Sequence, residues 1–341
     1  MSKIEYGSLV IKSGGIQTLV EDWPGRVGYY KYGYAISGAA DHYAHRMANL
    51  LVGNPITEAT LEIAGGLFEA EFKHDTVIAV TGADMNPEIN GKAISLWKSI
   101  RVNNGDVIKF NVSKGVGFRA YIAFAGGINV PVFFGSKSTC IWGAYGGFQG
   151  RALRKGDILQ IGKLQEKQLE KLEGRYIKPR FIPNYENTWK VRMLPGPTAA
   201  PDYVTEKGYE KIYSTIFKID RNSDRSGYRL ITPKEIFPQE WARKTGGVAG
   251  LHPSNLVDMG YPIPGGLNVT GDMIIILGPD GPCGGGFTII GTVIYYDVWK
   301  VFQAIPAKDY IKFEYVDIDE AEKLRKEQDE IFKEEVVIGG V

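Results

Sequence analysis

The chain has 341 residues, 44% of them hydrophobic, which is enough for two domains or one large β-rich unit. Its formal net charge of +1 gives no indication of a nucleic-acid or membrane-surface partner, and no run of about 18 apolar residues predicts a membrane span. Two distant cysteines, Cys140 and Cys283, and the lack of a hydrophobic N-terminal signal segment indicate reduced thiols in a cytoplasmic protein.

The first half of the chain predicts strand after strand with one helix. Strands are expected at 8–12 and 16–20, and a helix at about 41–53 with Asp41 as its candidate N-cap. Further short strands are expected at Thr60–Ile63, Leu67–Phe72, Thr76–Thr81, Ile94–Ile100, Val107–Val112 and Arg119–Ala125, before a closing segment at Arg151–Ile161. Glycine, asparagine or aspartate separates these strands, and this spacing favours an antiparallel barrel or sandwich over βαβ units.

The second half begins after a charged, proline-bearing stretch that we interpret as a connector. Strands are expected at Trp189–Leu194, Ile216–Asp220, Tyr228–Ile231 and Tyr310–Tyr315, with helices at about 201–215 and 296–303. Charges alternate at helical spacing over 318–334, which predicts a solvated helix, and the apolar tail Val336–Val341 is suited to pair with a sheet edge of this chain or of a partner. The predicted domains are 1–162, a connector at 163–188, 189–316, and a C-terminal helix and tail at 317–341.

The stretch Thr245–Trp299 contains no lysine or arginine and is punctuated by glycines. Two apolar runs in it, Met273–Leu277 and Phe287–Ile294, predict buried strands bounded by turns. The run Gly284-Gly285-Gly286 follows Asp280 closely, so that backbone N–H groups and a carboxylate are available to a planar polar guest. The alternative is that Gly-Pro-Asp-Gly-Pro forms a tight hairpin turn without a ligand.

Several common chemistries have no signature here. The chain lacks a P-loop, a dinucleotide-binding glycine motif and a nucleophile elbow, so nucleotide binding and hydrolysis of those types are not predicted. His42 and His45 share a helix face, but no cysteine or acidic cluster accompanies them, and no metal site is predicted.

Longer motifs resemble a known family. They include Gly15-Ile16-Gln17-Thr18-Leu19, Pro24-Gly25-Arg26-Val27-Gly28, Ser37-Gly38-Ala39-Ala40-Asp41, Gly135-Ser136-Lys137-Ser138-Thr139, Ser223-Asp224-Arg225-Ser226-Gly227 and Gly278-Pro279-Asp280-Gly281-Pro282. The chain is similar, over about residues 7–316, to the KipA-like family of biotin-dependent carboxyltransferases and allophanate hydrolase subunit 2. That family includes the C subunit of 5-oxoprolinase, and the later motifs are more similar to the carboxyltransferase part of urea carboxylase.

The resemblance implies a mainly β fold of two cyclophilin-like β-barrel halves with a few short helices. It implies transfer of a carboxyl group from carboxybiotin to a urea-like or amide nitrogen, or the related ATP-dependent opening of a lactam. A KipI-like partner (allophanate hydrolase subunit 1) and a biotin carboxyl carrier protein are implied as well. No Met-Lys dipeptide occurs in the chain, so biotin is expected on another protein, and ATP only on a partner subunit.

Carboxyl transfer needs donors for a developing negative charge, a cation for the carboxylate and an acceptor for substrate N–H groups. The first of these roles is assigned to the backbone of Gly284, Gly285 and Gly286, the second to Arg225 or Arg243, and the third to Asp280 or Asp272. His252 and Asn255 are further candidates, and Arg26 and Ser37 are candidates from the first half. Each has a structural alternative, such as a local ion pair at Asp224–Arg225 or a backbone hydrogen bond from His252.

Two other functions stay open on the sequence alone. The first is a non-catalytic, KipA-like regulatory protein that binds a KipI-like partner. The second, indicated only by the aromatic content, is a carbohydrate-binding β-module.

Overall fold

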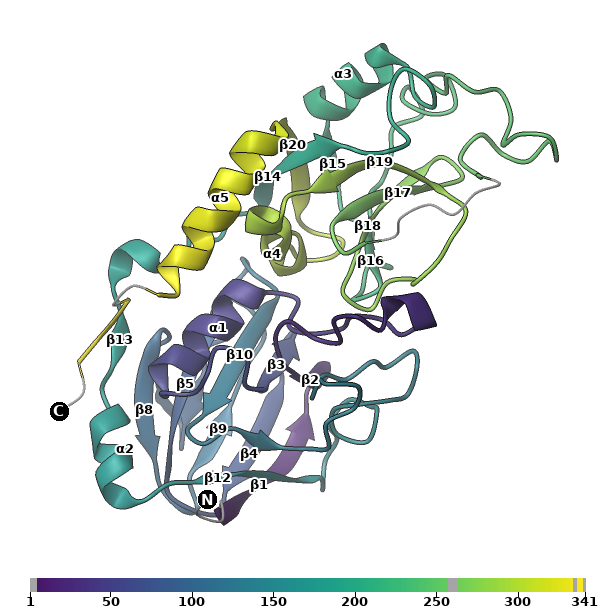
Figure 1. Cartoon of the computed structure of the whole chain (residues 1–341). Helices are drawn as coiled ribbons and strands as arrows, with labels where there is room; N and C mark the ends of the chain where they lie inside the picture. Colours follow the sequence, from purple (N-terminus) through teal and green to yellow (C-terminus); the bar gives the residue numbers. More distant parts are fainter. Residues whose placement is uncertain (1–4, 257–262, 334–335, 340–341) are drawn as a thin grey trace. The chain divides into compact units, whose positions relative to one another are not determined.

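The strands assemble into three sheets of seven strands each (Figure 1). The computed structural model describes residues 5–256, 263–333 and 336–339. Among these residues no sheet closes into a barrel, and the predicted mainly β fold is confirmed. Contacts divide the chain into two compact units: unit 1 is Met1–Tyr29, Ile36–Tyr185 and Ile331–Val341, and unit 2 is Tyr30–Ala35 and Glu186–Glu330.

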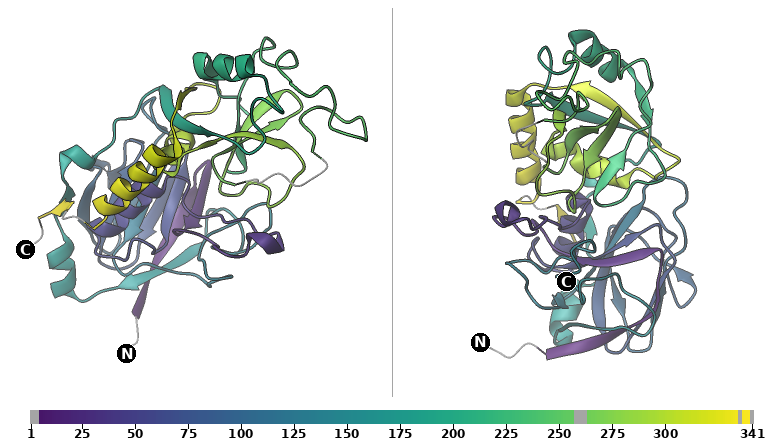
Figure 2. Two further views of the ribbon diagram at one scale, coloured as in Figure 1. Left: turned by 45° about the horizontal axis from the view of Figure 1, so that its top comes forward. Right: turned by 90° about the vertical axis from the view of Figure 1, so that its right-hand side faces the viewer.

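Unit 1 contains two of the sheets. The first has the order β11 (Ile128–Asn129), β12 (Ile158–Lys163), β1 (Glu5–Gly14), β4 (Phe68–Phe72), β9 (Val107–Lys109), β6 (Glu88–Ile89) and β7 (Lys92–Ala93). The second has the order β2 (Gln17–Glu21), β3 (Thr60–Ala64), β10 (Arg119–Phe124), β5 (Thr76–Gly82), β8 (Lys98–Val102), β13 (Tyr176–Ile177) and β21 (Val337–Ile338). β1, the purple strand in Figures 1 and 2, lies between β12 and β4.

The core of unit 1 is formed by side chains from both of its sheets. Phe72 and Ile108 contribute from the first sheet, and Ile63 and Ile122 from the second; all four are fully buried. Because side chains alternate between the faces of a strand, the apolar residues on one face of each sheet reach one shared core.

Helix α1 (His42–Leu51) covers the other face of the second sheet, over β10 and β5 (Figure 1). The predicted N-cap is confirmed, because the Asp41 carboxylate accepts a hydrogen bond of 2.9 Å from the Ala44 N–H. The hydroxyl of Thr81 on β5 donates to the carbonyl of Ala44. Covered on both faces, β10 is buried at all six positions.

Unit 2 is built on the third sheet. Its order is β15 (Ile216–Lys218), β20 (Tyr310–Tyr315), β14 (Thr188–Pro195), β19 (Thr288–Val293), β17 (Gly266–Thr270), β18 (Met273–Leu277) and β16 (Gly227–Arg229). Only β14 and β20 pair in parallel, and the other pairs of this sheet are antiparallel. Helices α3 (Glu206–Ser214), α4 (Tyr295–Gln303) and α5 (Ile318–Ile331) complete the unit.

Some strands of unit 1 differ from the predicted ones; the strand expected at Val107–Val112, for example, ends at Lys109 as β9. Extended backbone expected over Ile94–Ile100 begins only at Lys98, because Trp97 adopts a left-handed conformation with φ 59°. Within the closing segment Arg151–Ile161, the strand β12 begins only at Ile158, because Gly156 (φ 92°) lies in a turn just before it.

The stretch 163–188, expected as a connector, has regular structure. It contains helix α2 (Glu166–Leu172), strand β13 and a 3-10 turn at Pro179–Phe181. Gln165 and Gln168 form a capping box at the start of α2, and Leu169 is buried. The chain passes from unit 1 to unit 2 between Tyr185 and Glu186.

Candidate functional site

One face of the sheet in unit 2 carries a cavity of about 240 Å³. Arg229 on β16 and Asn268 on β17 both lie directly opposite Ile275 on β18, the strand between them. Directly opposed residues share a face, so this cross-strand row brings a cation and an amide together over an apolar floor. The cavity is lined by Ser226, Gly227, Arg229, Asn268, Thr270, Ile275, Leu277, Pro282, Gly284, Gly285 and Phe287.

The polar side chains of this cavity present hydrogen-bond donors. The Thr270 hydroxyl donates to Asn268 Oδ1 over 2.8 Å, which leaves the Asn268 amide N–H groups without an acceptor among the described residues. Arg229 donates through one terminal nitrogen to the carbonyl of Asn222, and no described carboxylate pairs with it. Among the residues that the structure describes, no carboxylate lines the cavity, so this lining favours an anion or a carbonyl oxygen.

The glycine run has two structural roles. A Cβ added to Gly284 or Gly285 would meet no described residue within 4 Å, so packing against the described part of the chain requires neither glycine. Both line the cavity, and their lack of a side chain leaves it open. Gly286 differs, because a Cβ there would lie 2.9 Å from the carbonyl oxygen of Leu256.

Arg225 and Asp280 pair with each other in the interior of unit 2. Arg225 Nε donates to Asp280 Oδ2 over 2.7 Å, and the Asp280 N–H donates to the Arg225 carbonyl over 3.1 Å. Their side chains are 3% and 1% exposed. Because these are backbone and side-chain bonds between two segments, the pair braces the turn after β18 against the turn before β16.

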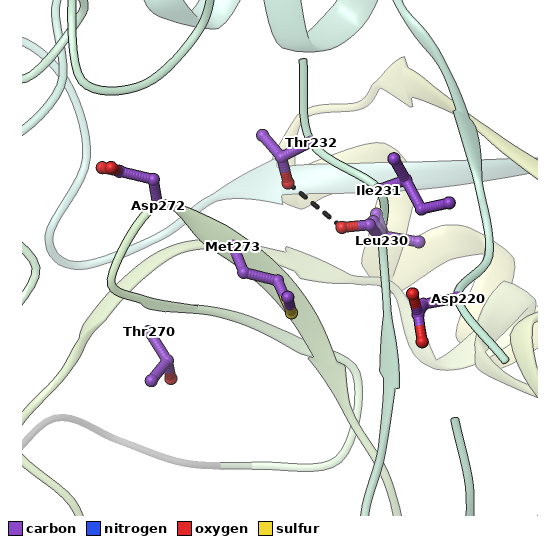
Figure 3. Close-up of a pocket in the computed structure, with 7 residues that line it drawn as sticks. All are labelled: Asp220, Leu230, Ile231, Thr232, Thr270, Asp272 and Met273. Atoms are coloured by element: carbon purple, nitrogen blue, oxygen red, sulfur yellow. Dashed lines mark hydrogen bonds between the residues drawn. The ribbon is translucent and has the colours of Figure 1, made fainter. Parts of the chain in front are cut away.

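Asp272 and His252, also predicted from the sequence, lie together at the hairpin between β17 and β18. His252 Nε2 is 3.4 Å from Asp272 Oδ1, and the indole N–H of Trp241 donates to the same oxygen over 2.9 Å. Asp272 also borders a second cavity of about 470 Å³, together with Thr270 and Met273. Figure 3 shows Asp272 at one end of this cavity and Asp220 at the other.

Arg243 and Asn255 lie outside both cavities. The Arg243 guanidinium is 4.7 Å from the centre of the Tyr203 ring, a cation–π contact. Asn255 forms an isolated bridge with Phe287, and its N–H donates to the His252 carbonyl. Asn255 therefore holds the segment of His252 beside Phe287, which lines the first cavity.

Arg26 and Ser37 are buried in unit 1. Arg26 donates to the carbonyl of Ser138, and its guanidinium lies 4.8 Å from the centre of the Tyr145 ring. Ser37 has a left-handed φ of 55°, an uncommon conformation for a residue other than glycine. Both residues support the turn after β2, where the Arg26 N–H donates to the Ile36 carbonyl.

The sequence analysis did not single out Arg229, Asn268, Thr270 or Trp241 as site residues. A signal was present for two of them: in Leu267-Asn268-Val269-Thr270, buried Leu267 and Val269 alternate with polar residues. Such alternation predicts a strand with a polar face, here the cavity face of β17. Arg229 and Trp241 carry no comparable local signal.

Comparisons with known proteins agree with the sequence motifs. The model of the carboxyltransferase domain, subdomain A and B, matches residues 32–315. The urea amidolyase of Lachancea kluyveri is 37% identical over 326 residues, which are 94% of this chain and 17% of that protein. The C subunit of the Escherichia coli 5-oxoprolinase is 31% identical over 330 residues, which are 96% of this chain and 97% of that protein.

A solved structure shows the same architecture. The crystal structure of the K. lactis urea amidolyase matches with a TM-score of 0.88 and 34% identity, over 97% of this chain and 20% of that chain. The chain thus spans about a fifth of the urea amidolyases it matches, but nearly all of the 5-oxoprolinase protein. No helix within the described ranges is long and apolar enough to span a bilayer.

Proposed function

The chain belongs to the family of the carboxyltransferase domain, subdomain A and B, and from this premise we propose that it is a subunit of a biotin-dependent carboxyltransferase. The acceptor is a urea-like, amide or lactam nitrogen. The same site would serve a related ATP-dependent, lactam-opening complex of the 5-oxoprolinase kind. In either case ATP is bound by a partner subunit, because this chain has no nucleotide-binding motif.

The donor-lined cavity of unit 2 is the observation that supports this proposal. Carboxyl transfer places negative charge on oxygen atoms, and preorganised donors in a partly dry cavity stabilise that charge more than water does. Asn268 offers amide N–H groups, Arg229 a cation, and Gly284 an unobstructed backbone. These residues hold and orient an oxygen-rich planar group above Ile275.

The residues of this cavity fit the head group of biotin. A ureido bicycle has one polar carbonyl edge and an apolar remainder, and the lining offers donors beside the apolar surface of Leu277 and Phe287. When bound, carboxybiotin supplies the activated carboxyl group. Asn268 and Arg229 would bind its oxygen atoms, and the apolar floor would exclude water from them.

The remaining parts of the reaction are assigned to other proteins. Because the sequence contains no Met-Lys dipeptide, we place the biotin on a carrier protein, with a KipI-like first subunit as the direct partner. We also propose that each half is cyclophilin-like and that the two domains span residues 1–162 and 189–316. The support for this is the mainly β architecture of both units.

One observation favours the non-catalytic alternative. Two of the residues assigned to catalysis, Arg225 and Asp280, pair with each other in the interior. A KipA-like regulatory protein that only binds a KipI-like partner would need such bracing but no reactive cavity. The two functions differ in what the donor-lined cavity does, and the experiment is directed at that cavity.

The test reconstitutes the chain with its first subunit, a biotin carrier and a biotin carboxylase. Acceptor-dependent ATP turnover is measured with a panel of ureas, amides and lactams. The variant N268D keeps the oxygen that accepts from Thr270 and replaces the amide donor with a carboxylate oxygen. It is expected to lower kcat/KM about 100-fold, the usual loss on removing one such donor.

The matched control is N129D, which makes the same change at an exposed residue of unit 1. Full activity in N268D would exclude the cavity as the site. An assembled complex that turns over none of the acceptors would contradict the carboxyltransferase function and favour the regulatory one.

A further inference from the structure

One oxygen of the Asp272 carboxylate accepts a hydrogen bond from Trp241 and lies close to a ring nitrogen of His252. Asp272 follows Gly271 at the turn between β17 and β18, two residues after Thr270, which borders both cavities. The Trp241 indole N–H is 2.9 Å from Oδ1, and His252 Nε2 is 3.4 Å from the same atom. The position of this carboxylate is therefore set by residues from a different part of the chain.

Ser254 determines which ring nitrogen of His252 faces Asp272 as a donor. The backbone N–H of Ser254 lies 3.2 Å from His252 Nδ1, and its hydroxyl lies 2.8 Å from the same nitrogen. A backbone N–H can only donate, so Nδ1 accepts and the proton of the neutral ring is on Nε2. The N–H of Nε2 then lies on the side of Asp272, 3.4 Å from its Oδ1.

Trp241 and Ser254 are fixed by packing. Trp241 is 2% exposed and stacks on Phe237 with ring centres 4.4 Å apart. Ser254 is fully buried, and its carbonyl accepts from the N–H of Thr288 on β19. Rigid neighbours of this kind are what a precisely oriented carboxylate requires.

The second oxygen of Asp272 is available to a guest. No described residue donates to Oδ2, and the side chain is 42% exposed. In Figure 3 the carboxylate turns away from Met273 at the edge of the larger cavity. A carboxylate oxygen accepts hydrogen bonds only, so its complement is an N–H or O–H donor.

We propose that Asp272 is the residue that recognises the N–H group of the acceptor substrate, and that Trp241, His252 and Ser254 are positioning residues for it. This inference rests on the proposed function. It places the acceptor at the end of this sheet face where the Asp272 carboxylate lies. The group that gives up the carboxyl occupies the end with Asn268, and Thr270 lies between the two ends. Substrates without an N–H group are excluded, because an alkyl group would face an unpaired carboxylate oxygen.

The experiment measures binding to the full chain alone, so it does not depend on turnover. The probes are two matched pairs, urea with tetramethylurea and 2-pyrrolidone with N-methyl-2-pyrrolidone. Ligand-observed NMR titration measures the affinity of each probe. In each pair only the N–H groups differ. The wild-type chain is expected to bind at least one N–H probe about tenfold more tightly than its methylated analogue.

The variant D272N keeps an oxygen for Trp241 and His252 and replaces the free oxygen with an amide donor. It is expected to remove the preference for N–H probes, whereas D319N, the same change on the exposed surface of α5, leaves it intact. H252L is expected to weaken the preference, and H252Q, which retains a donor, to restore it. A merely structural role for His252 would not produce this rescue.

An unchanged N–H preference in D272N would overturn the inference, and so would the absence of any preference in the wild-type chain. The two proposals fail separately. A reconstituted complex without turnover, but with an N–H preference that D272N abolishes, contradicts only the carboxyltransferase function. Normal turnover in D272N contradicts only the role of Asp272.

Discussion

His45 is a fully buried histidine in the middle of α1. Its Nδ1 is 2.8 Å from the Thr60 hydroxyl, and its Nε2 is 3.4 Å from the Asn49 amide. Burial, followed by the positive charge of Arg46, lowers the pKa of His45 from 6.5 to about 3. In the folded protein the ring is therefore neutral between about pH 3 and pH 6.5, where the histidine of an unfolded chain is protonated.

This pKa makes folding sensitive to acid. At pH values between the folded and the unfolded pKa, the unfolded chain binds a proton that the folded protein does not. The free energy of unfolding therefore decreases as the pH is lowered. His45 is expected to contribute a loss of about 2 kcal/mol between pH 7 and pH 5. Urea unfolding at both pH values measures the loss.

The control for this prediction is H45Q, whose amide can donate to Thr60 and accept from Asn49 without titrating. The loss between the two pH values is expected to be smaller in H45Q by about the contribution of His45. An equal loss in both proteins would show that the ring does not stay neutral in the folded state.

Individual residues also show the limit of sequence-based prediction for the site. Arg225 was predicted as the cation that holds the carboxylate, and Asp280 as a carboxylate beside the glycine run. Their mutual pairing was not predicted, because it joins residues 55 positions apart and depends on how two turns meet. Asp272 and His252 were predicted as separate candidates, and the structure brings them together.

At the scale of elements, Asp297 fastens helix α4 to strand β14. Its carboxylate accepts 2.7 and 2.9 Å bonds from the Arg192 guanidinium and is 2.7 Å from the Lys300 ammonium. Burial alone would raise the pKa of Asp297, but the bonds from Arg192 and the charge of Lys300 outweigh it and hold the pKa below its usual value. This contribution to stability is present at neutral pH and is lost as the pH falls through that lowered pKa.

The variant D297N is expected to destabilise the protein by about 3 kcal/mol, because it leaves two cations beside a neutral amide in a largely buried site. Thermal and urea denaturation measure the change. D319N, which removes the same charge from the exposed surface of α5, is expected to leave stability within about 0.5 kcal/mol of wild type. Equal stability of D297N and D319N would mean that α4 is held by packing alone.

Elements with a clear apolar or alternating pattern were well predicted. The strands expected at Met273–Leu277 and Tyr310–Tyr315 coincide with β18 and β20. β17 was not predicted, because glycines flank it and its polar residues resemble a turn. β17 nevertheless supplies Asn268 and Thr270 to the cavity.

At the scale of the whole molecule, the chain leaves unit 1 after Tyr185, forms unit 2, and returns to unit 1 with its last residues. β21 pairs with β13, and Val336 is 1% exposed. Phe332 lies 3.6 Å from the Arg46 guanidinium, with its ring facing it. The sequence predicted that the apolar tail pairs with a sheet edge, here or on a partner, and the structure shows that it pairs with β13 of the same chain.

This return predicts that the C-terminal segment stabilises unit 1 selectively. V336D places a charge in a buried position, where it has no partner, and is expected to detach the segment from β13. The Lys178 N–H, which donates to the Val336 carbonyl over 2.9 Å, would then exchange its hydrogen at least about tenfold faster. Amides of β14 and β20 in unit 2 are expected to exchange at unchanged rates, as is Lys178 in the control I338D, because Ile338 is 40% exposed. Faster exchange throughout both units would instead indicate that the protein unfolds as one cooperative body, in which the tail has no local role.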